Sequence, residues 1–371
     1  MITRSTLTLT SPTGGTMRAT SCTLSLSDDR APYLLARVSV PAALAGDFAQ
    51  YDPRSTVPPT VLLEVARHGG TDGNSCAAQT AAARVGGKVK ASKLTQLGAN
   101  KARHFTSLST PFNATHIDGQ HLAGGFVVDA AKHDMKRVEY VLSLTGRELL
   151  LQDYAPTGDA TLAATTLGAL VSQILLRAGQ SPALGETSFQ ECGLPEWKPT
   201  QSAWAVVEAL LDDRGYRLIF DLDGRWHIVS RKHRYVIDST TQIPVLDVAE
   251  LIGATRSLSR DPWADRVDIV ATHKDANGVV TAFRSSAGAN PHAKGVYLDR
   301  GENPPSTEAT TAAELLARYR ARGDSITLTL PLDLDYQPLT FIDFNATRYL
   351  IATVEHDFTD HTTTLTTREG A

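Results

Sequence analysis

Threonine in alternation with apolar residues is the feature that most limits how this chain can fold. The chain has 42 threonines, and many stand in alternating runs near its two ends, at residues 6–10 and 362–367. A β-branched side chain with a hydroxyl suits the wetted face of a pleated strand, while the apolar residues in between face a core. Both ends of the chain are therefore predicted to lie in β-sheets.

The composition is that of an ordinary water-soluble protein. The 371 residues are 42% hydrophobic and carry a formal net charge of −4, which argues against a nucleic-acid coat or an acidic tail. A chain of this length predicts two or three compact units. No apolar run has the length of a membrane span or a signal peptide, so we expect no membrane segment and no secretory route. Cys22, Cys76 and Cys192 are far apart and odd in number, which indicates buried or incidental thiols.

Residues 1–155 are predicted to form a first β-rich unit. Alternating patterns indicate strands at 22–27, 33–40, 61–67, 125–133 and 136–144. With the N-terminal run, these make five or six antiparallel strands, enough for a small barrel or sandwich. The long segment 69–103 between them is unusual for a loop in a compact domain, so it should be functional, mobile or partly helical, with helix most plausible at 77–84.

Residues 156–240 have a different texture, that of a small α+β insertion. Apolar residues recur at helical spacing over 167–175, and Gly179 follows the last basic residue of that pattern. A second helix is predicted at 202–214, ended by Gly215. A hairpin over 216–228 turns at Asp223-Gly224. The segment is therefore predicted to fold as helix, helix and hairpin.

Residues 241–371 return to the β texture, with one helix. Strands are predicted at 263–270 and 278–284, joined by Asn277-Gly278, and then at 325–330, 339–344, 348–358 and 361–367. Thr311 and Glu314 form a capping box for a helix at about 308–322. The fold class is thus predicted as mainly β with an α+β insertion, although no repeat between the two β-rich units is visible residue by residue.

The usual signatures of enzymes are missing from the sequence. Gly86-Gly87-Lys88 resembles the end of a phosphate loop but lacks its first glycine and its hydroxyl residue. His116, Asp118 and His121 could converge on a metal ion if the chain turned at Asp118-Gly119, but an exposed Asp-Gly turn is the simpler interpretation.

A second His/Asp cluster spans residues 355–361. Strand alternation sends His356 to the face opposite Glu355 and Asp357, so this cluster is interpreted as a solvated strand end. We therefore predict a protein that is not an enzyme, with no catalytic, cofactor-binding or metal-binding residues.

Charge is distributed unevenly along the chain. The segment 69–103 has one acid, Asp72, and six cations: Arg84, Lys88, Lys90, Lys93, Lys101 and Arg103. The segment 324–360 has Arg348 alone against seven acids: Asp324, Asp333, Asp335, Asp343, Glu355, Asp357 and Asp360. Opposite patches of this kind can guide docking between copies or partners. A merely uneven surface charge explains the pattern equally well.

The order of motifs resembles that of phage tail hub proteins, the family of baseplate hubs and type VI spike-hub proteins. The resemblance is carried by the strand at 263–271, the helix segment 312–323, the strand segment 325–332 and the closing segment 348–370. The segments 204–211 and 216–224 are similar to the inserted domain of the family, and 125–154 to the end of its first barrel. Many members have a Pro-Gly-Asp turn where this chain has Gln337-Pro338-Leu339-Thr340.

This resemblance implies a homotrimer in which each chain contributes two tube-like antiparallel β-barrels. Six similar barrels would then mate with a six-fold tail tube, in a tail-tip hub that closes the channel until DNA ejection. It implies the distal tail protein or tail tube ring, the tape measure protein and tip spike or fibre proteins as partners, and DNA only in transit. The protein would be made in the host cytoplasm and end in the virion.

Two other functions remain open. One is a tail-associated cell-wall hydrolase, with His116, Asp118 and His121 as metal ligands. The other is a β-module that binds host-surface carbohydrate, for which a content of 6% aromatic residues offers few stacking platforms. Since a DNA channel works best with few cations on its wall, we also expect the acidic C-terminal unit to line the lumen and the basic loop to face outward.

Overall fold

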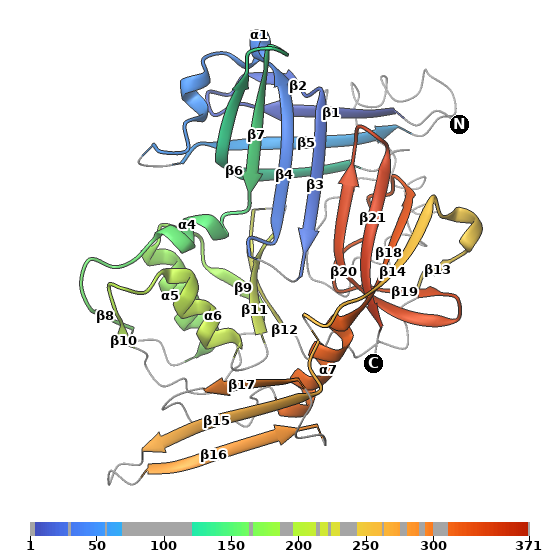
Figure 1. Cartoon of the computed structure of the whole chain (residues 1–371). Helices are drawn as coiled ribbons and strands as arrows, with labels where there is room; N and C mark the ends of the chain where they lie inside the picture. Colours follow the sequence, from blue (N-terminus) through green and yellow to red (C-terminus); the bar gives the residue numbers. More distant parts are fainter. Residues whose placement is uncertain are drawn as a thin grey trace, which may run out of the picture.

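Strands from the two ends of the chain meet in one 13-stranded sheet. The computed structural model describes residues 4–28, 31–55, 58–68, 121–162, 166–185, 196–212, 216–221, 224–230, 243–261, 263–274, 280–288, 294–299 and 311–369. Within them the chain is mainly β with helices in its middle part, as predicted (Figure 1). The expected basic loop at 69–103, its helix at 77–84, Cys76 and Cys192 lie outside the described residues.

The first unit contains each strand predicted for it. Its elements are β1 (Arg4–Thr10), β2 (Thr16–Arg18), β3 (Ser21–Ser27), β4 (Leu34–Pro41), the short helix α1 (Ala42–Ala45), the 3-10 helix η1 (Phe48–Tyr51), β5 (Thr60–His68), β6 (His121–Asp134), β7 (Glu139–Thr145) and α4 (Glu148–Asp153). Their order in the sheet is β3-β4-β7-β6-β5-β1-β2. All of these neighbours pair antiparallel.

The C-terminal part of the sheet has six strands in a similar order, β14-β18-β21-β20-β19-β13. The elements are β13 (Val245–Leu246), the 3-10 helix η4 (Val248–Glu250), β14 (Gly253–Leu258), β18 (Asp324–Pro331), β19 (Phe341–Phe344), β20 (Thr347–Asp357) and β21 (Thr362–Glu369). The last four were predicted from their alternation. Strands β13 and β14 were not.

The two parts join where one edge of β20 changes partner. Residues 347–350 of β20 pair with β19, and residues 353–357 pair with β3 of the first unit. Ala352, between these stretches, is the extra residue of a β-bulge opposite β21. The two β-rich units predicted from the sequence therefore share a continuous sheet, and we call the β3–β20 pairing the seam.

A structural repeat relates the two parts of the sheet, although none is visible in the sequence. Strands β3, β4, β7, β6 and β5 correspond in order to β14, β18, β21, β20 and β19. The register agrees as well: β6 has a bulge at Asp129 opposite β7, as β20 has at Ala352 opposite β21. Strands β4 and β18 both end on a proline. Strand β13 departs from the repeat, because it pairs parallel where β1 pairs antiparallel.

The hairpin turns of the repeat match residue by residue. Oδ1 of Asp134 accepts hydrogen bonds from the backbone N–H groups of residues 136 and 137, and Oδ1 of Asp357 accepts them from residues 359 and 360. Val138 and His361 occupy the same turn position with φ of 57° and 55°. The bond from Ala42 N to Val138 O (2.9 Å) is matched by one from Leu332 N to His361 O (2.8 Å). We conclude that the two β-rich units share one local design.

One apolar core runs under both parts of the sheet. Its largest fully buried members in the strands include Leu9, Leu24, Leu34, Leu63 and Phe126, and leucines and isoleucines of β18 to β21 continue it. The alternation predicted from threonine is observed: Leu7 and Leu9 are buried while Thr6, Thr8 and Thr10 are half-buried. Cys22 is a buried free thiol, as expected, and burial raises its pKa to about 12.

The middle unit folds as predicted, from helices and a hairpin. Its elements are β8 (Ala160–Thr161), α5 (Leu167–Arg177), β9 (Ala183–Gly185), β10 (Glu196–Trp197), α6 (Ala203–Asp212), β11 (Tyr216–Phe220) and β12 (Trp226–Ser230). Helix α5 is followed by Gly179 at φ +71°, the left-handed position that favours glycine. Trp197 and Trp226 are fully buried in a core of its own. Gly215 and Asp223 lie outside the described residues.

The strands that follow form a separate three-stranded sheet outside the 13-stranded one. The elements β15 (Arg266–Lys274), β16 (Val280–Ala287) and β17 (Gly295–Asp299) make this sheet, which α7 (Ala312–Gly323) covers through a small separate core. Figure 1 shows these strands away from the large sheet, with α7 between the two. The predicted capping box is confirmed, since Thr311 and Glu314 bond each other's backbone N–H. The predicted hairpin partners β15 and β16 do pair.

Candidate assembly site at the junction of the units

A buried polar cluster lies where the first unit, the middle unit and the C-terminal strands meet. We call it the junction and define it by Asp28, Tyr33, Glu148 and Arg217. Arg217, on β11, forms an ion pair with Asp28, which directly follows β3, and their side chains are 7% and 0% exposed. The guanidinium also donates to the carbonyl of Asp28 and lies 5.4 Å from the centre of the Tyr33 ring. These contacts tie the middle unit to the first.

The same cluster reaches the C-terminal strands. The backbone N–H of Asp28 donates to the carbonyl of Ala352, the bulge residue of β20, at 2.9 Å. Arg368 on β21 is 4% exposed; burial lowers the pKa of its guanidinium, and the negative charge of Asp28 opposes that shift. Asp28 therefore contacts both of the other units.

Glu148, at the start of α4, is the second acid of the junction. Its Oε1 accepts hydrogen bonds from the backbone N–H groups of Tyr33 (3.3 Å) and Phe220 (3.1 Å). Burial raises the pKa of this carboxyl to about 7, although these N–H groups and the charge of Arg217 act to lower it. Its Oε2 has no hydrogen-bond partner among the described residues. Burial therefore makes this carboxyl easier to protonate than an exposed glutamate.

The structure corrects one expectation about the His/Asp cluster at 355–361. His356 does face away from Glu355 and Asp357, as alternation predicts, but it is 1% exposed and not solvated. Its Nδ1 lies 3.0 Å from Oγ1 of Thr363, and burial lowers the pKa of the imidazole to about 4. His356 is therefore a neutral core residue at physiological pH.

The other predicted candidates fall mostly outside the described residues. His116 and Asp118 lie there, and so do Gly86, Gly87 and Lys88; for His121, at the start of β6, only the backbone is described. In the described part of the chain, no group of three or more His, Cys, Asp and Glu side chains could hold a metal ion. Part of the acidic segment is neutralised, because Asp324 pairs with Arg256 and Asp343 with Arg348.

Analysis of the sequence missed the junction. Alternation over 216–220 predicts that Arg217 and Ile219 face solvent, yet every residue of β11 is buried. The hairpin has two covered faces: Tyr216, Leu218 and Phe220 pack into the core of the middle unit, while Ile219 packs into the core of the large sheet. An arginine inside the otherwise apolar strand YRLIF was the available signal for a buried charge.

The face of the large sheet opposite the core is rich in short hydroxyl side chains. Over the five central strands β4, β3, β20, β21 and β18, alternation and register place five charged residues on this face: Arg37, Arg348, Glu355, Asp357 and Arg368. Most of the other side chains are Ser or Thr: Thr23, Ser25, Ser39, Ser325, Thr327, Thr329, Thr353, Thr364 and Thr366. The seam therefore crosses a broad surface on which short hydroxyl side chains outnumber charged ones.

The fold is shared with two solved tail proteins. The structure superposes on the tail protein from Neisseria meningitidis MC58 with a TM-score of 0.63 and 11% identity, over 99% of this chain and 97% of that one. It superposes on the 43 kDa tail protein of prophage MuSo2 from Shewanella oneidensis with a TM-score of 0.58 and 12% identity, over 99% and 98%. No protein-family model matches the chain, and no curated protein does. None of the described helices is long and apolar enough to cross a membrane.

Proposed function

We propose that the protein is a structural hub, or minor tail protein, at the tip of a phage tail. In this proposal three copies form a ring that adapts the six-fold tail tube to a three-fold tip and closes the channel until DNA is ejected. The shared fold with two tail proteins supports a place in a tail. The contact partners would be the distal tail protein or tail tube ring, the tape measure protein and tip spike or fibre proteins, all in the virion.

The observation that carries this proposal is the repeat within the large sheet. One chain holds two copies of the same strand order, bulge and hairpin turn. Three chains would then present six similar surfaces to a six-fold ring, which is what an adaptor between three-fold and six-fold symmetry needs. Three chains with a single copy of this unit would present only three such surfaces to the six sites of the ring.

The hydroxyl-rich face of the large sheet is the surface we assign to the channel. DNA binds a wall in proportion to the cations that neutralise its phosphates, so a wall of Ser and Thr lets it slide. Among the five central strands the cations on this face are Arg37, Arg348 and Arg368; Arg348 is paired with Asp343, and Arg368 is 4% exposed. The proposal keeps the acidic C-terminal strands on the lumen and the basic loop 69–103 outside. A trimer structure with Lys88, Lys90 and Lys93 projecting into the channel would contradict it.

Native mass spectrometry of the purified protein, followed by electron microscopy of assembled particles, tests the hub role. We expect trimers, or trimers formed on the tail, and density for three copies at the tail tip around the channel. Density for six copies, or density only on the outside of the tail, would contradict an adaptor of three chains.

The hydrolase and the carbohydrate-binding module are alternatives that a separate pair of assays addresses. The hydrolase depends on His116, Asp118 and His121, whose side chains lie outside the described residues. Zymography on peptidoglycan with and without a chelator would reveal a metal-dependent lysin, and a glycan array would reveal sugar binding. We expect both assays to be blank.

A further inference from the structure

The outer strand of the C-terminal half of the large sheet is an exposed edge. Strand β14 pairs with β18 on one side and with no described strand on the other, and all six of its residues are exposed. Leu258 is 75% exposed and Ile252, just before the strand, 62%. Figure 1 shows β14 on the side of the large sheet away from the helices of the middle unit. An open edge with apolar side chains is a surface on which another strand can pair.

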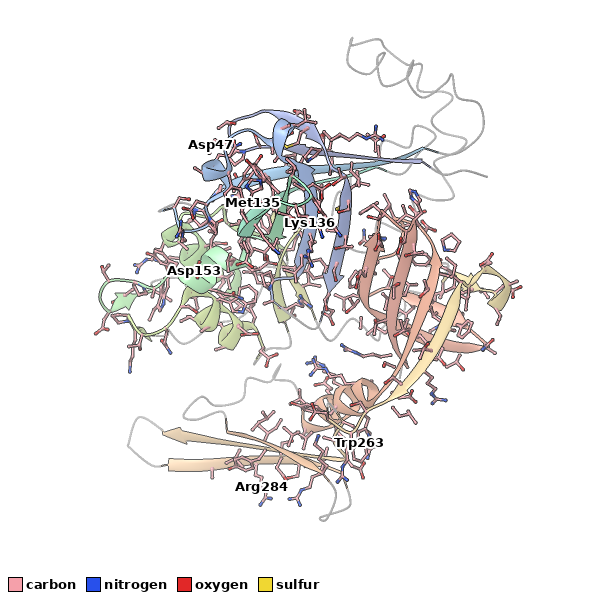
Figure 2. All side chains as sticks on the ribbon, turned by 45° about the horizontal axis from the view of Figure 1, so that its top comes forward. Asp47, Met135, Lys136, Asp153, Trp263 and Arg284 are labelled. Atoms are coloured by element: carbon pink, nitrogen blue, oxygen red, sulfur yellow. The ribbon has the colours of Figure 1, made fainter. Side chains whose placement is uncertain are left out.

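A second open edge lies on the first unit. Strand β6 pairs with β5 over residues 121–127 and with β7 over residues 127–134. The N–H of Val128 donates to the carbonyl of Pro59 at 2.9 Å. After Val128, β6 pairs with β7 along one edge, and no described strand pairs with its other edge. Figure 2 labels Met135 and Lys136 in the turn that follows this stretch, and Met135 is 80% exposed.

The repeat shows what belongs on that edge. The equivalent of β6 is β20, where the N–H of Ile351 bonds the carbonyl of Thr340 at 2.8 Å as Val128 bonds Pro59. Directly after this point β20 pairs with β3 to form the seam. The equivalent of β3 is β14, because β3–β4 and β14–β18 have the same register. The repeat therefore places a strand like β14 on the open edge of β6.

We infer that β14 of one copy pairs antiparallel with residues 130–134 of β6 in the next copy, and so continues the sheet around a ring. The two edges lie on different units of one chain, so the partner is a second copy and the contact is head-to-tail. This inference rests on the proposed hub and names the strands that join its subunits. The seam within each chain and the contact between chains would then be the same contact, repeated around the ring.

The register of the seam gives the register of this contact. In the seam, Val354 is opposite Leu26, Glu355 opposite Ser25, and Asp357 opposite Thr23. The corresponding intermolecular pairs are Ala131 with Leu258, Lys132 with Ser257, and Asp134 with Thr255. Leu26 is 3% exposed whereas its equivalent Leu258 is 75% exposed. The contact would bury Leu258 as the seam buries Leu26.

Cysteine cross-linking of the whole protein tests this register. In K132C/S257C, the new thiols face each other across the contact, and mild oxidation should link chains in a nonreducing gel. The matched control is S25C/E355C, the equivalent pair of the seam, which should form a bridge within one chain. The register-shifted control K132C/T255C should cross-link far less, since its Cα atoms are offset by two residues. Peptide mapping assigns each bridge and separates it from native cysteines.

The outcomes distinguish this inference from the proposed hub. Covalent species that stop at three chains, with a mapped 132–257 bridge, support both. Trimers by native mass spectrometry without that bridge, while the seam control is bridged, overturn the strand pairing and leave the trimer standing. A mapped bridge in rings of another size overturns the trimer and leaves the pairing standing. A bridge within one chain, or monomers without any bridge, overturns the pairing.

Discussion

At the residue scale, the junction makes stability depend on pH through Glu148. The pKa of this carboxyl is about 7 in the folded protein against 4.5 for an ordinary glutamate. Between these values the folded state holds a proton that the unfolded state releases, so the stabilising contribution is complete below pH 4.5 and is lost as the pH rises through 7. His356 acts in the opposite sense, because its folded pKa of about 4 favours folding as the pH rises.

Glu148→Gln should remove the part of the pH dependence that comes from Glu148. We expect the free energy of unfolding of the wild type, relative to the variant, to fall by up to roughly 3 kcal/mol between pH 4.5 and about 7. Urea unfolding followed by tryptophan fluorescence at a series of pH values measures it. Glu208→Gln, an exposed carboxylate on α6, is the control and should track the wild type. Equal slopes for wild type and Glu148→Gln would contradict the raised pKa.

The residues that local pattern could not predict are those whose burial depends on contacts far along the chain. Alternation correctly predicted that His356 faces away from its acidic neighbours. It did not predict that this part of the strand is buried. Arg217 is buried because the middle unit packs on the first, with Asp28 as its partner 189 positions away. No window of local sequence contains that information.

At the element scale, the end of helix α7 packs closely against the segment that precedes β15. Figure 2 labels Trp263 beside this helix. A Cβ placed on Gly323, at the end of α7, would lie 2.6 Å from Cβ and Cδ1 of Trp263. Gly323→Ala should therefore destabilise the protein by about 1–3 kcal/mol through overpacking. A thermal unfolding comparison with Gly158→Ala, where nothing lies within 4 Å, measures it. Equal melting temperatures for the two variants would contradict this tight contact.

The edge strand β14 should matter for assembly and not for the fold of one chain. Leu258→Lys changes a side chain that is 75% exposed in the monomer, so the free energy of unfolding of the monomer should change by no more than about 0.5 kcal/mol. Loss of an apolar contact between copies should weaken their association about tenfold or more. Urea unfolding measures the stability of the monomer, and analytical ultracentrifugation measures the association of the copies.

Leu44→Lys is the matched control for this edge. Leu44, in α1, is 63% exposed and lies outside the proposed strand pairing. We expect this variant to associate like the wild type. If Leu44→Lys and Leu258→Lys reduced association equally, a general effect of added charge and not the β14 contact would be responsible.

Elements with a strong apolar period were predictable, and weakly patterned ones were not. The strands β4, β7 and β18 bury alternate residues and were found, as were the amphipathic helix α5 and the capping box of α7. Strand β14, with the sequence GATRSL, has no apolar alternation because neither of its faces is covered in one chain. The short β13 has two residues and offers no period at all.

At the scale of the whole molecule, the shared sheet and its repeat could not be read from the sequence. The seam joins residues 23–27 to residues 353–357, a pairing that loop length and local pattern do not specify. The repeat is visible in register, bulges and turn geometry. Between the β6–β7 hairpin and the β20–β21 hairpin few residues are identical, and His133-Asp134 in the first match His356-Asp357 in the second. Turn geometry preserves Asp at these positions because its carboxylate accepts the exposed N–H groups of the turn.

The hydroxyl-rich face leads to a prediction about DNA passage. If this face lines the channel, T327K/T364K should let particles assemble but slow DNA ejection, because each added lysine offers a binding site to phosphate as DNA passes. The delay should shrink as salt is raised, since counterion release weakens such contacts. Fluorescence of a DNA dye during receptor-triggered ejection, over a range of salt concentrations, measures the rate. The two threonines lie half-buried on β18 and β21, so both substitutions are on one wall.

T157K/T200K makes the same chemical change at two exposed threonines of the middle unit. This control should eject DNA at the wild-type rate at every salt concentration. A delay in both variants would indicate a general effect of added charge on the particle. Normal, salt-independent ejection by T327K/T364K particles that contain the full amount of the protein would place this face away from the DNA. The channel would then have to be lined by another surface of the ring, while the strand pairing between copies would still be open to the cross-linking test.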